Sequence, residues 1–215
     1  MSREDGWTAA WLASNIRHDE ITDVQVRSGN SVLVKLKKRP LPTLVTTTSR
    51  ECLSAADLPP EVHQADNEFL VNIKAKPAFL ADVVALSSQR NFGFGGVGNF
   101  YSACGSDNLR NFLDSETRFI LQGLRQHSAI RSVDRLTDRS YLVQRHTLPS
   151  VTVLAINDYD VTTESLRTAI ALHGKADFVL ASNPNSRFTQ DSITATRHSG
   201  VKLMKWGNLL GALQY

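Results

Sequence analysis

The pattern of apolar and polar positions divides the chain into short elements of two kinds. Apolar residues three or four positions apart predict amphipathic helices at residues 7–16 and 117–130. Each helix is followed by alternating or continuous apolar runs, at 21–36 and 139–156, which predict β-strands. Within the first run, Ser28-Gly29-Asn30 is typical of the turn of a β-hairpin. Each half of the chain therefore starts with a helix followed by strands.

The rest of each half repeats one order of elements. A helix comes next, beginning at a capping box formed by Thr48 and Glu51 in the first half and covering 162–174 in the second. A buried strand, another helix, a short strand and a terminal helical turn follow, with the strands at 68–73 and 177–182 and the helices at 79–89 and 188–198. In outline the predicted order is α-β-β-β-α-β-α-β.

This repetition indicates an internal duplication. Residues 67–103 align without a gap on 176–212, and apolar residues match apolar residues along the alignment. The identical pairs are Phe69/Phe178, Phe79/Phe188, Asp82/Asp191, Gly98/Gly207, Asn99/Asn208 and Ala103/Ala212.

The likeness extends upstream with small gaps. Residues 14–23 resemble 128–138, and the run SVLV at 31–34 resembles SVTV at 150–153. We therefore predict two tandem α/β units, at residues 1–104 and 117–215, joined by a linker at residues 105–116.

Composition is that of an ordinary globular protein. The 215 residues are 41% hydrophobic and 21% charged, and no apolar run reaches the length of a membrane span. Cys52 and Cys104 are too few for a disulfide framework or a zinc site, and we expect a cytoplasmic protein without a membrane partner. The net charge of +3 is compatible with a nucleic-acid partner but does not require one.

The stretch GFGGVGNF contains the G-x-G-x-x-G spelling of a dinucleotide-binding loop, in Gly93, Gly95 and Gly98. Its counterpart in the second half, KLMKWGNL, keeps only Gly207. Because a phosphate-binding loop would not tolerate that exchange, we expect no nucleotide at Gly93–Gly98. Gly98 and Gly207 are instead predicted to end a strand in a tight turn.

One segment resembles a known family. Residues 176–213, ADFVLASNPNSRFTQDSITATRHSGVKLMKWGNLLGAL, resemble the C-terminal half of Mrr-type domains of the PD-(D/E)xK restriction-endonuclease-like fold, in their succession of strand, polar turn, helix, glycine, strand and closing turn. The resemblance covers about 150–213 and, through the repeat, extends to 67–103. It implies two tandem restriction-endonuclease-like α/β units, each a mixed sheet flanked by helices, that form an internal pseudo-dimer. It also implies carboxylates on the second strand, an acid-x-Lys on the third, and a divalent metal that activates water.

The residues that would carry this chemistry are incomplete. In the first half, the resemblance places Asp23 at the second-strand acid, Lys35 where the next acid belongs and Lys37 at the lysine. In the second half, Asp138 remains, but Leu154 and Ile156 occupy the acid and lysine positions.

A metal held by one carboxylate beside two ammonium groups would be poorly bound, because oxygen ligands supply the charge that hard cations need. We therefore expect that catalysis by the family mechanism is lost and that no cofactor is bound. Relocated acids are the alternative, with Glu20 or Asp19 joining Asp23, or Asp158 joining Asp138. Only in that case would magnesium or manganese be the cofactor.

A basic cluster occupies the predicted hairpin and its exit. It consists of Arg27, Lys35, Lys37, Lys38 and Arg39. Alternation along the strand places Lys35 and Lys37 on one face, opposite Val34 and Leu36. This face is either solvated or in contact with phosphates.

Together these features favour a catalytically degenerate, nuclease-like protein. It would act as a nucleic-acid-binding or scaffolding component of a DNA-processing, defence or mobile-element system. One alternative is a divalent-metal-dependent nuclease with relocated acidic residues, and another is a protein–protein adaptor without nucleic-acid binding. The choice between DNA and RNA, the identity of any protein partner and the oligomeric state stay open at this point.

Overall fold

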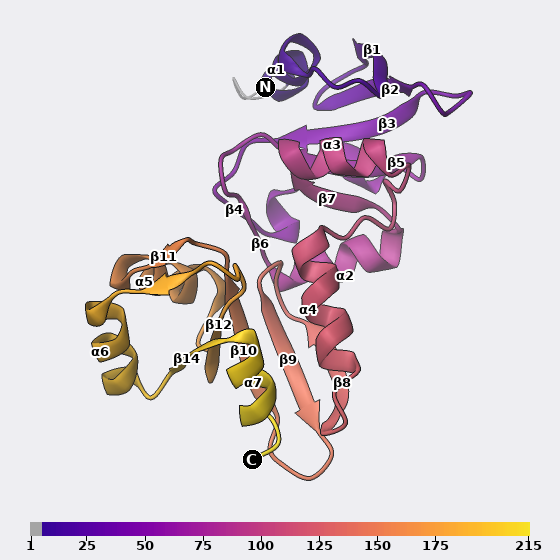
Figure 1. The fold of residues 1–215 in the computed structure, drawn as a ribbon. Coiled ribbons are helices and arrows are strands. Elements are labelled where there is room, and N and C mark those ends of the chain that lie inside the picture. Colours follow the sequence, from indigo (N-terminus) through magenta and orange to yellow (C-terminus); the bar gives the residue numbers. More distant parts are fainter. Residues whose placement is uncertain (1–5) are drawn as a thin grey trace. The chain divides into compact units, whose positions relative to one another are not determined.

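The computed structural model describes residues 6–215, except for the side chain of His198. The chain divides between Asp114 and Ser115 into two compact units, and this division lies within the segment 105–116 assigned above to the linker. Each unit is an α/β structure with a mixed five-stranded sheet flanked by helices (Figure 1). Among the helices of residues 6–215, none combines the length and the apolar character that crossing a membrane would require.

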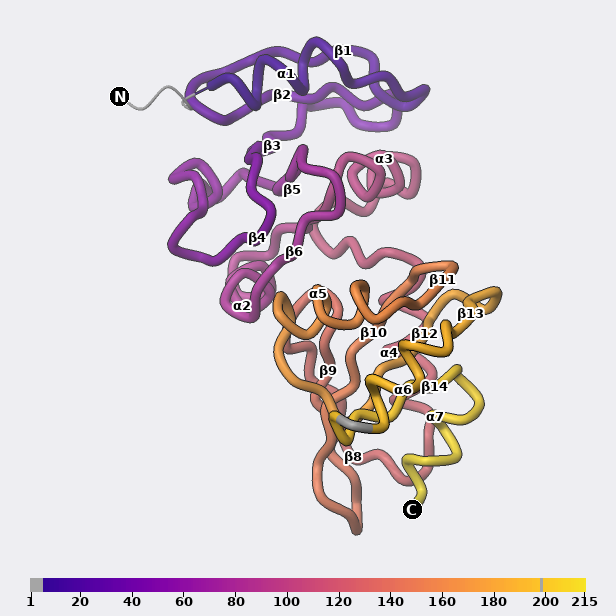
Figure 2. The backbone as a smooth tube through the Cα atoms, turned by 90° about the vertical axis from the view of Figure 1, so that its left-hand side faces the viewer, coloured from indigo at the N-terminus to yellow at the C-terminus, as the bar shows by residue number. Residues whose placement is uncertain are grey.

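Unit 1 contains a sheet with strand order β1-β2-β3-β5-β7. The strands of β1-β2-β3 are antiparallel, and those of β3-β5-β7 are parallel. These strands are β1 (Ile21–Val26), β2 (Ser31–Leu36), β3 (Thr43–Thr48), β5 (Asn67–Asn72) and β7 (Gly93–Gly96). The helices are α1 (Trp7–Asn15), α2 (Ala81–Arg90) and α3 (Val97–Gly105), and β4 (Cys52–Leu53) pairs with β6 (Ala78–Phe79). Figure 2 shows α1 lying with the β1–β2 hairpin.

Both faces of this sheet are covered by apolar side chains. On one face, α1 and α3 pack against the strands, and Phe69 meets Phe100 and Phe112 at ring-centroid distances of 5.3 and 5.9 Å. On the other face, α2 and the segment between β4 and β5 pack around Leu70 and Phe94. The parallel strands are therefore buried on both sides, as their continuous apolar sequence predicts.

Unit 2 has the same arrangement, with strand order β14-β12-β10-β9-β8. Its strands are β8 (Ile130–Arg135), β9 (Ser140–Arg145), β10 (Val151–Ile156), β12 (Phe178–Ala181) and β14 (Lys202–Lys205), and β11 (Asp160–Val161) pairs with β13 (Arg187–Phe188). Its helices are α4 (Ser115–Arg125), α5 (Thr163–His173), α6 (Gln190–Ser199) and α7 (Trp206–Ala212). Trp206 lies against Gly123 of α4, where a Cβ atom would collide with the indole ring, so the two helices pack closely.

The gapless part of the predicted duplication is confirmed in its order of elements. A shift of 109 residues carries β5 onto β12, α2 onto α6, β7 onto β14 and α3 onto α7, as it carries Phe69 onto Phe178. The pairing register follows the same shift, because Phe69 pairs with Gly93 and Phe178 with Lys202. Gly98 and Gly207 likewise occupy the same position, the second residue of a helix.

The upstream part of the sequence alignment is wrong by one strand. SVLV of β2 corresponds to SYLV of β9, since each begins the middle strand of an antiparallel trio, whereas 150–153 belongs to the third strand. Asp23 and Asp138 are not equivalent either, because Asp23 lies within β1 and Asp138 follows β8. The pattern had missed β3, whose threonines lie between Pro42 and a polar segment, and β8, whose charged residues interrupt the apolar run.

The helix predicted from Thr48 and Glu51 does not form. Thr48 is the last residue of β3, and the chain continues through β4 into two short 3₁₀ helices, Ala55–Asp57 and Pro60–His63. Pairing of β3 with β5 explains this, since it holds Thr48 in an extended conformation and no helix can begin there. In unit 2 the corresponding helix, α5, is confirmed, with Thr162 and Ser165 as its capping box.

Candidate functional sites at the start of the second and the end of the third strand

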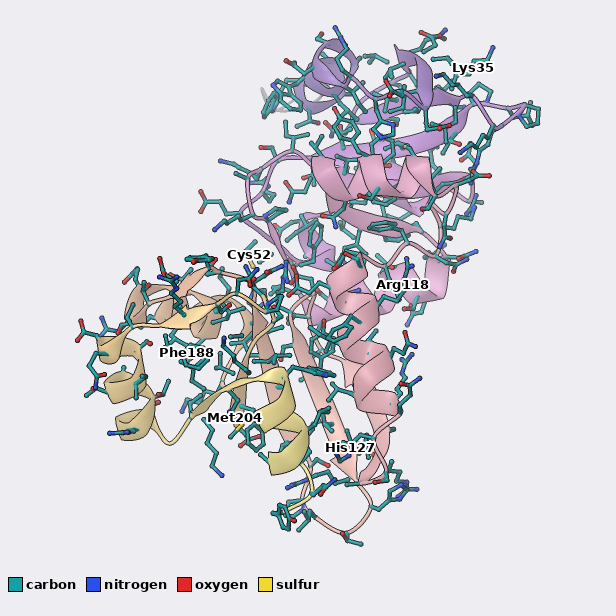
Figure 3. All side chains as sticks on the ribbon, in the orientation of Figure 1. Lys35, Cys52, Arg118, His127, Phe188 and Met204 are labelled. Carbon is teal, nitrogen blue, oxygen red and sulfur yellow. The ribbon has the colours of Figure 1, made fainter. Side chains whose placement is uncertain are left out.

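The predicted alternation along β2 is confirmed. Val34 and Leu36 are buried, whereas Lys35 and, after the strand, Lys37 are exposed. Figure 3 shows Lys35 at the edge of unit 1. Lys35 is the cross-strand partner of Asp23, whose carboxylate accepts a hydrogen bond of 2.6 Å from the side chain of Gln25. The face that carries the lysines therefore also carries an acid.

The other basic residues of the cluster bind acids within unit 1. Arg27 lies 3.5 Å from Asp66, and Lys38 lies 3.4 Å from Glu20. Arg39 is the most enclosed, with its side chain 22% exposed and its guanidinium bonded to both Glu68 and Asp107 at 2.5 Å. Arg39 thus ties the β2–β3 connection to β5 and to the segment after α3.

The placement of the family motif in unit 1 needs correction. Asp23 lies on the first strand and Lys35 on the second, so neither occupies the position that the resemblance implied. The third strand is β3, which ends in Thr46, Thr47 and Thr48. In unit 2, Asp138 lies between the first and the second strand, and Leu154 and Ile156 lie on the third.

An equivalent backbone hydrogen bond within each unit shows which residues of the two third strands correspond. Thr47 N–H donates to the carbonyl of Asn30, and Ala155 N–H donates to the carbonyl of Arg139, each at 2.8 Å. The final three residues of the third strand are then Thr46 to Thr48 in unit 1 and Leu154 to Ile156 in unit 2, without a carboxylate or an ammonium group. Within the described residues, no cluster of three or more His, Cys, Asp or Glu side chains could hold a metal ion.

In unit 2, a charged cluster fills the corner of the sheet where the second strand begins and the third strand ends. Glu116, the second residue of α4, binds Arg139 at 2.6 Å and accepts hydrogen bonds from Asn157 at 2.7 Å and from Ser182. Arg139 comes from the β8–β9 turn, and Asn157 and Ser182 follow the carboxyl ends of β10 and β12. Glu116 is therefore committed to contacts inside unit 2.

In unit 1, a neutral cluster occupies the same corner. Thr8, the second residue of α1, donates to Asn30 Oδ1 at 2.9 Å, and its hydroxyl lies 2.8 Å from that of Thr47. The N–H of Gly6 also donates to Asn30 Oδ1, at 3.2 Å. Sequence reasoning missed both corners, because their members lie far apart in the chain. The helix expected at 117–130 began after Glu116, so no local signal pointed to that residue.

Comparison of the chain with protein-family models, with curated proteins and with solved structures gives no significant match. The internal alignment of the two units is therefore the comparison that identifies these corners as equivalent.

The glycine-rich stretch is explained by packing. A Cβ atom on Gly93 would overlap the carbonyl oxygen of Leu109, and one on Gly95 would lie 2.5 Å from the Cβ atom of Asn99. The prediction that Gly98 ends a strand is wrong, since β7 ends at Gly96 and Gly98 lies in the first turn of α3. The glycines of β7 thus allow a loop and a capping side chain to approach the strand.

Asp138 binds a buried histidine. His173 Nδ1 lies 3.4 Å from Asp138 Oδ1 and 3.1 Å from the hydroxyl of Thr137, and the His173 side chain is only 7% exposed. Burial lowers the pKa of His173 below its ordinary value, against the opposing effect of the Asp138 carboxylate and with a smaller contribution from Arg139. Asp138 therefore supports α5 and is not open to solvent as a metal ligand.

This lowered pKa predicts a pH dependence of stability. Below the ordinary pKa of 6.5, the unfolded chain binds a proton that the folded chain resists, so stability is lost as the pH falls from about 6.5 through the lowered pKa. We expect the wild type to lose more unfolding free energy than His173→Asn between about pH 7.5 and pH 5, as measured by urea titration. Equal losses in the two proteins would contradict this assignment.

Proposed function

We propose that the chain is a catalytically inactive, nuclease-like protein that binds nucleic acid, or acts as a scaffold, in a DNA-processing, defence or mobile-element system. The mixed sheet, with three antiparallel strands followed by parallel ones, agrees with the resemblance to the restriction-endonuclease-like fold. The observation that carries the proposal is the third strand, where both units hold threonine or apolar residues in place of acid and lysine. Metal-assisted hydrolysis depends on such charged groups.

Two features support contact with phosphates. Lys35 and Lys37 lie exposed on the same face of a strand, where ammonium groups can approach a nucleic-acid backbone. Unit 2 contains twelve Lys and Arg against eight Asp and Glu, whereas unit 1 contains twelve against thirteen. A pseudo-dimer in which the two units face the two strands of a duplex is part of the same proposal.

A protein–protein adaptor is the second candidate. Arg27, Lys38 and Arg39 already bind acids of unit 1, and Asp23 stands opposite Lys35. These acids weaken the positive potential of the hairpin, and a scaffold would not need that potential. The nuclease alternative has less support, because Glu20 binds Lys38 and Asp138 binds His173.

Charge reversal on β2 tests the proposal. We expect Lys35→Glu with Lys37→Glu to weaken binding to labelled duplex or single-stranded DNA or RNA about tenfold or more, because attraction becomes repulsion. On duplex DNA, the slope of log affinity against log salt should shrink by about 0.9 for each phosphate that the variant no longer neutralises. Fluorescence anisotropy at several salt concentrations measures both.

The matched control reverses two other lysines of unit 1. Lys74→Glu with Lys76→Glu makes the same change in net charge away from β2 and should leave affinity nearly unchanged. If the wild type binds no nucleic acid even at low salt, the adaptor takes the place of this proposal. Cleavage of the substrates with magnesium or manganese, abolished by Asp23→Ala or Asp138→Ala, would favour the nuclease.

A further inference from the structure

The neutral corner of unit 1 opens into a pocket of about 190 Å³. Its walls come from the start of α1, the β1–β2 turn, the end of β3 and the segment around the two 3₁₀ helices. The side that faces solvent includes Trp7, which is 43% exposed, and Arg50, which is also exposed. The pocket thus combines one large aromatic ring, one guanidinium, the Asp57 carboxylate and several neutral polar groups.

The inner wall is a fixed set of hydrogen-bonding groups. Thr8 and Thr47 are 4% and 0% exposed, and their hydroxyls bond to each other. Asn30 accepts from Thr8 and Gly6 through the same oxygen, Oδ1, so neither bond uses the donor nitrogen of its amide. Asn30 N–H donates to Glu61 at 3.1 Å, and this bond holds the turn in place.

The rim at Arg50 is equally well supported. The buried side chain of Asn72 accepts from Arg50 N–H at 3.2 Å and donates to the Arg50 carbonyl at 2.8 Å. Asp57 lines the same rim and supplies a carboxylate. Hydrogen-bond donors and acceptors therefore line both sides of the pocket. On each side, hydrogen bonds hold the backbone that carries them in place.

The size of the pocket limits its occupant. Pockets for whole drug-sized ligands occupy about 300–1,000 Å³, so this one fits a single ring system that belongs to a larger molecule. A planar ring with polar edges can stack on tryptophan while its edge meets amide and hydroxyl groups. A phosphate attached to that ring would meet the guanidinium of Arg50 at the rim, where Arg50 also attracts the Asp57 carboxylate.

We propose that this pocket receives one unpaired base of a nucleic acid, stacked on Trp7, with its edge at Asn30 and its phosphate at Arg50. This proposal rests on the proposed function and specifies single-stranded or locally opened strands as the ligand. At the matching corner of unit 2, Glu116 binds both Arg139 and Ser182, so we expect one base site per chain.

Two tryptophans on one helix make a sharp test. Trp7 lines the pocket, whereas Trp11, one turn further along α1 and 38% exposed, does not appear among its lining residues. We expect Trp7→Ala to weaken binding of a short single strand about tenfold or more, Trp7→Phe to restore most of it, and Trp11→Ala to have little effect. A blunt duplex should be affected far less by Trp7→Ala than the single strand.

A second measurement uses nucleoside 5′-monophosphates as probes. Each chain should bind one monophosphate, and this binding should quench tryptophan fluorescence. In Trp7→Phe, the monophosphate should no longer quench the fluorescence of the remaining tryptophans. If strands bind but Trp7→Ala and Trp11→Ala behave alike, the pocket is not the site, while the proposed function stands. If monophosphates bind and polymers do not, the pocket is a mononucleotide site, and both the base site for nucleic acid and the proposed nucleic-acid binding fail.

Discussion

Phe69→Ala is expected to lower the unfolding free energy of unit 1 by about 3–5 kcal/mol, the usual cost of removing a buried aromatic ring from a core. Phe69 is fully buried and contacts Phe100 and Phe112, so its removal leaves a cavity between the sheet and α3. Urea unfolding of the full chain measures the change, and hydrogen exchange read by mass spectrometry assigns it to unit 1.

Leu41→Ala is the control for this experiment, because Leu41 is 74% exposed and such changes stay within about 0.5 kcal/mol. Phe178→Ala, at the equivalent position, should instead increase hydrogen exchange in unit 2. A Phe69→Ala protein as stable as Leu41→Ala would show that the core described for unit 1 is incorrect.

Glu116→Ala is expected to destabilise unit 2 by about 2–3 kcal/mol, because the substitution removes the shared acceptor of several donors. The Glu116 side chain is 15% exposed and that of Arg139 is 36% exposed, so solvent offsets part of the loss and the cost stays below that of a fully buried pair. Urea unfolding with hydrogen exchange again provides the measurement.

Two further variants serve as controls for Glu116→Ala. Glu164→Ala removes an exposed acid from the first turn of α5 and should cost less than about 1 kcal/mol. Glu116→Gln retains an acceptor for Ser182 or Asn157 and should fall between the two alanine variants. If Glu116→Ala costs no more than Glu164→Ala, the charged cluster does not contribute to the stability of unit 2.

Strong local signals in the sequence predicted most of the elements correctly. The continuous apolar runs at 68–73 and 177–182 became β5 and β12, and the helices after them appear within two residues of the expected bounds. The alternation of Val34, Lys35 and Leu36 likewise produced the expected buried and exposed faces of β2. In these cases the spacing of apolar residues, two in a strand and three to four in a helix, directly decides which side chains are buried.

Weaker local signals gave wrong predictions where contacts with other elements decide the structure. The threonines of β3 resembled a helix start at Thr48, yet pairing with β2 and β5 buries all six residues of the strand. Because β3 and β8 were missed, SVLV of β2 was aligned with the third strand of unit 2, and Asp23 was matched to Asp138, which follows β8. Two missed strands therefore misaligned the upstream parts of the two halves.

The sequence by itself determined the α/β class and the gapless part of the duplication, because identity along the chain and periodicity are local properties. Only the tertiary structure decided which polar groups meet. Thr8, Asn30 and Thr47 in unit 1, and Glu116, Arg139 and Ser182 in unit 2, come together because the first helix crosses the sheet where the second strand begins and the third ends. Such contacts depend on the register and packing of elements distant in sequence, for which a single sequence carries no periodic signal.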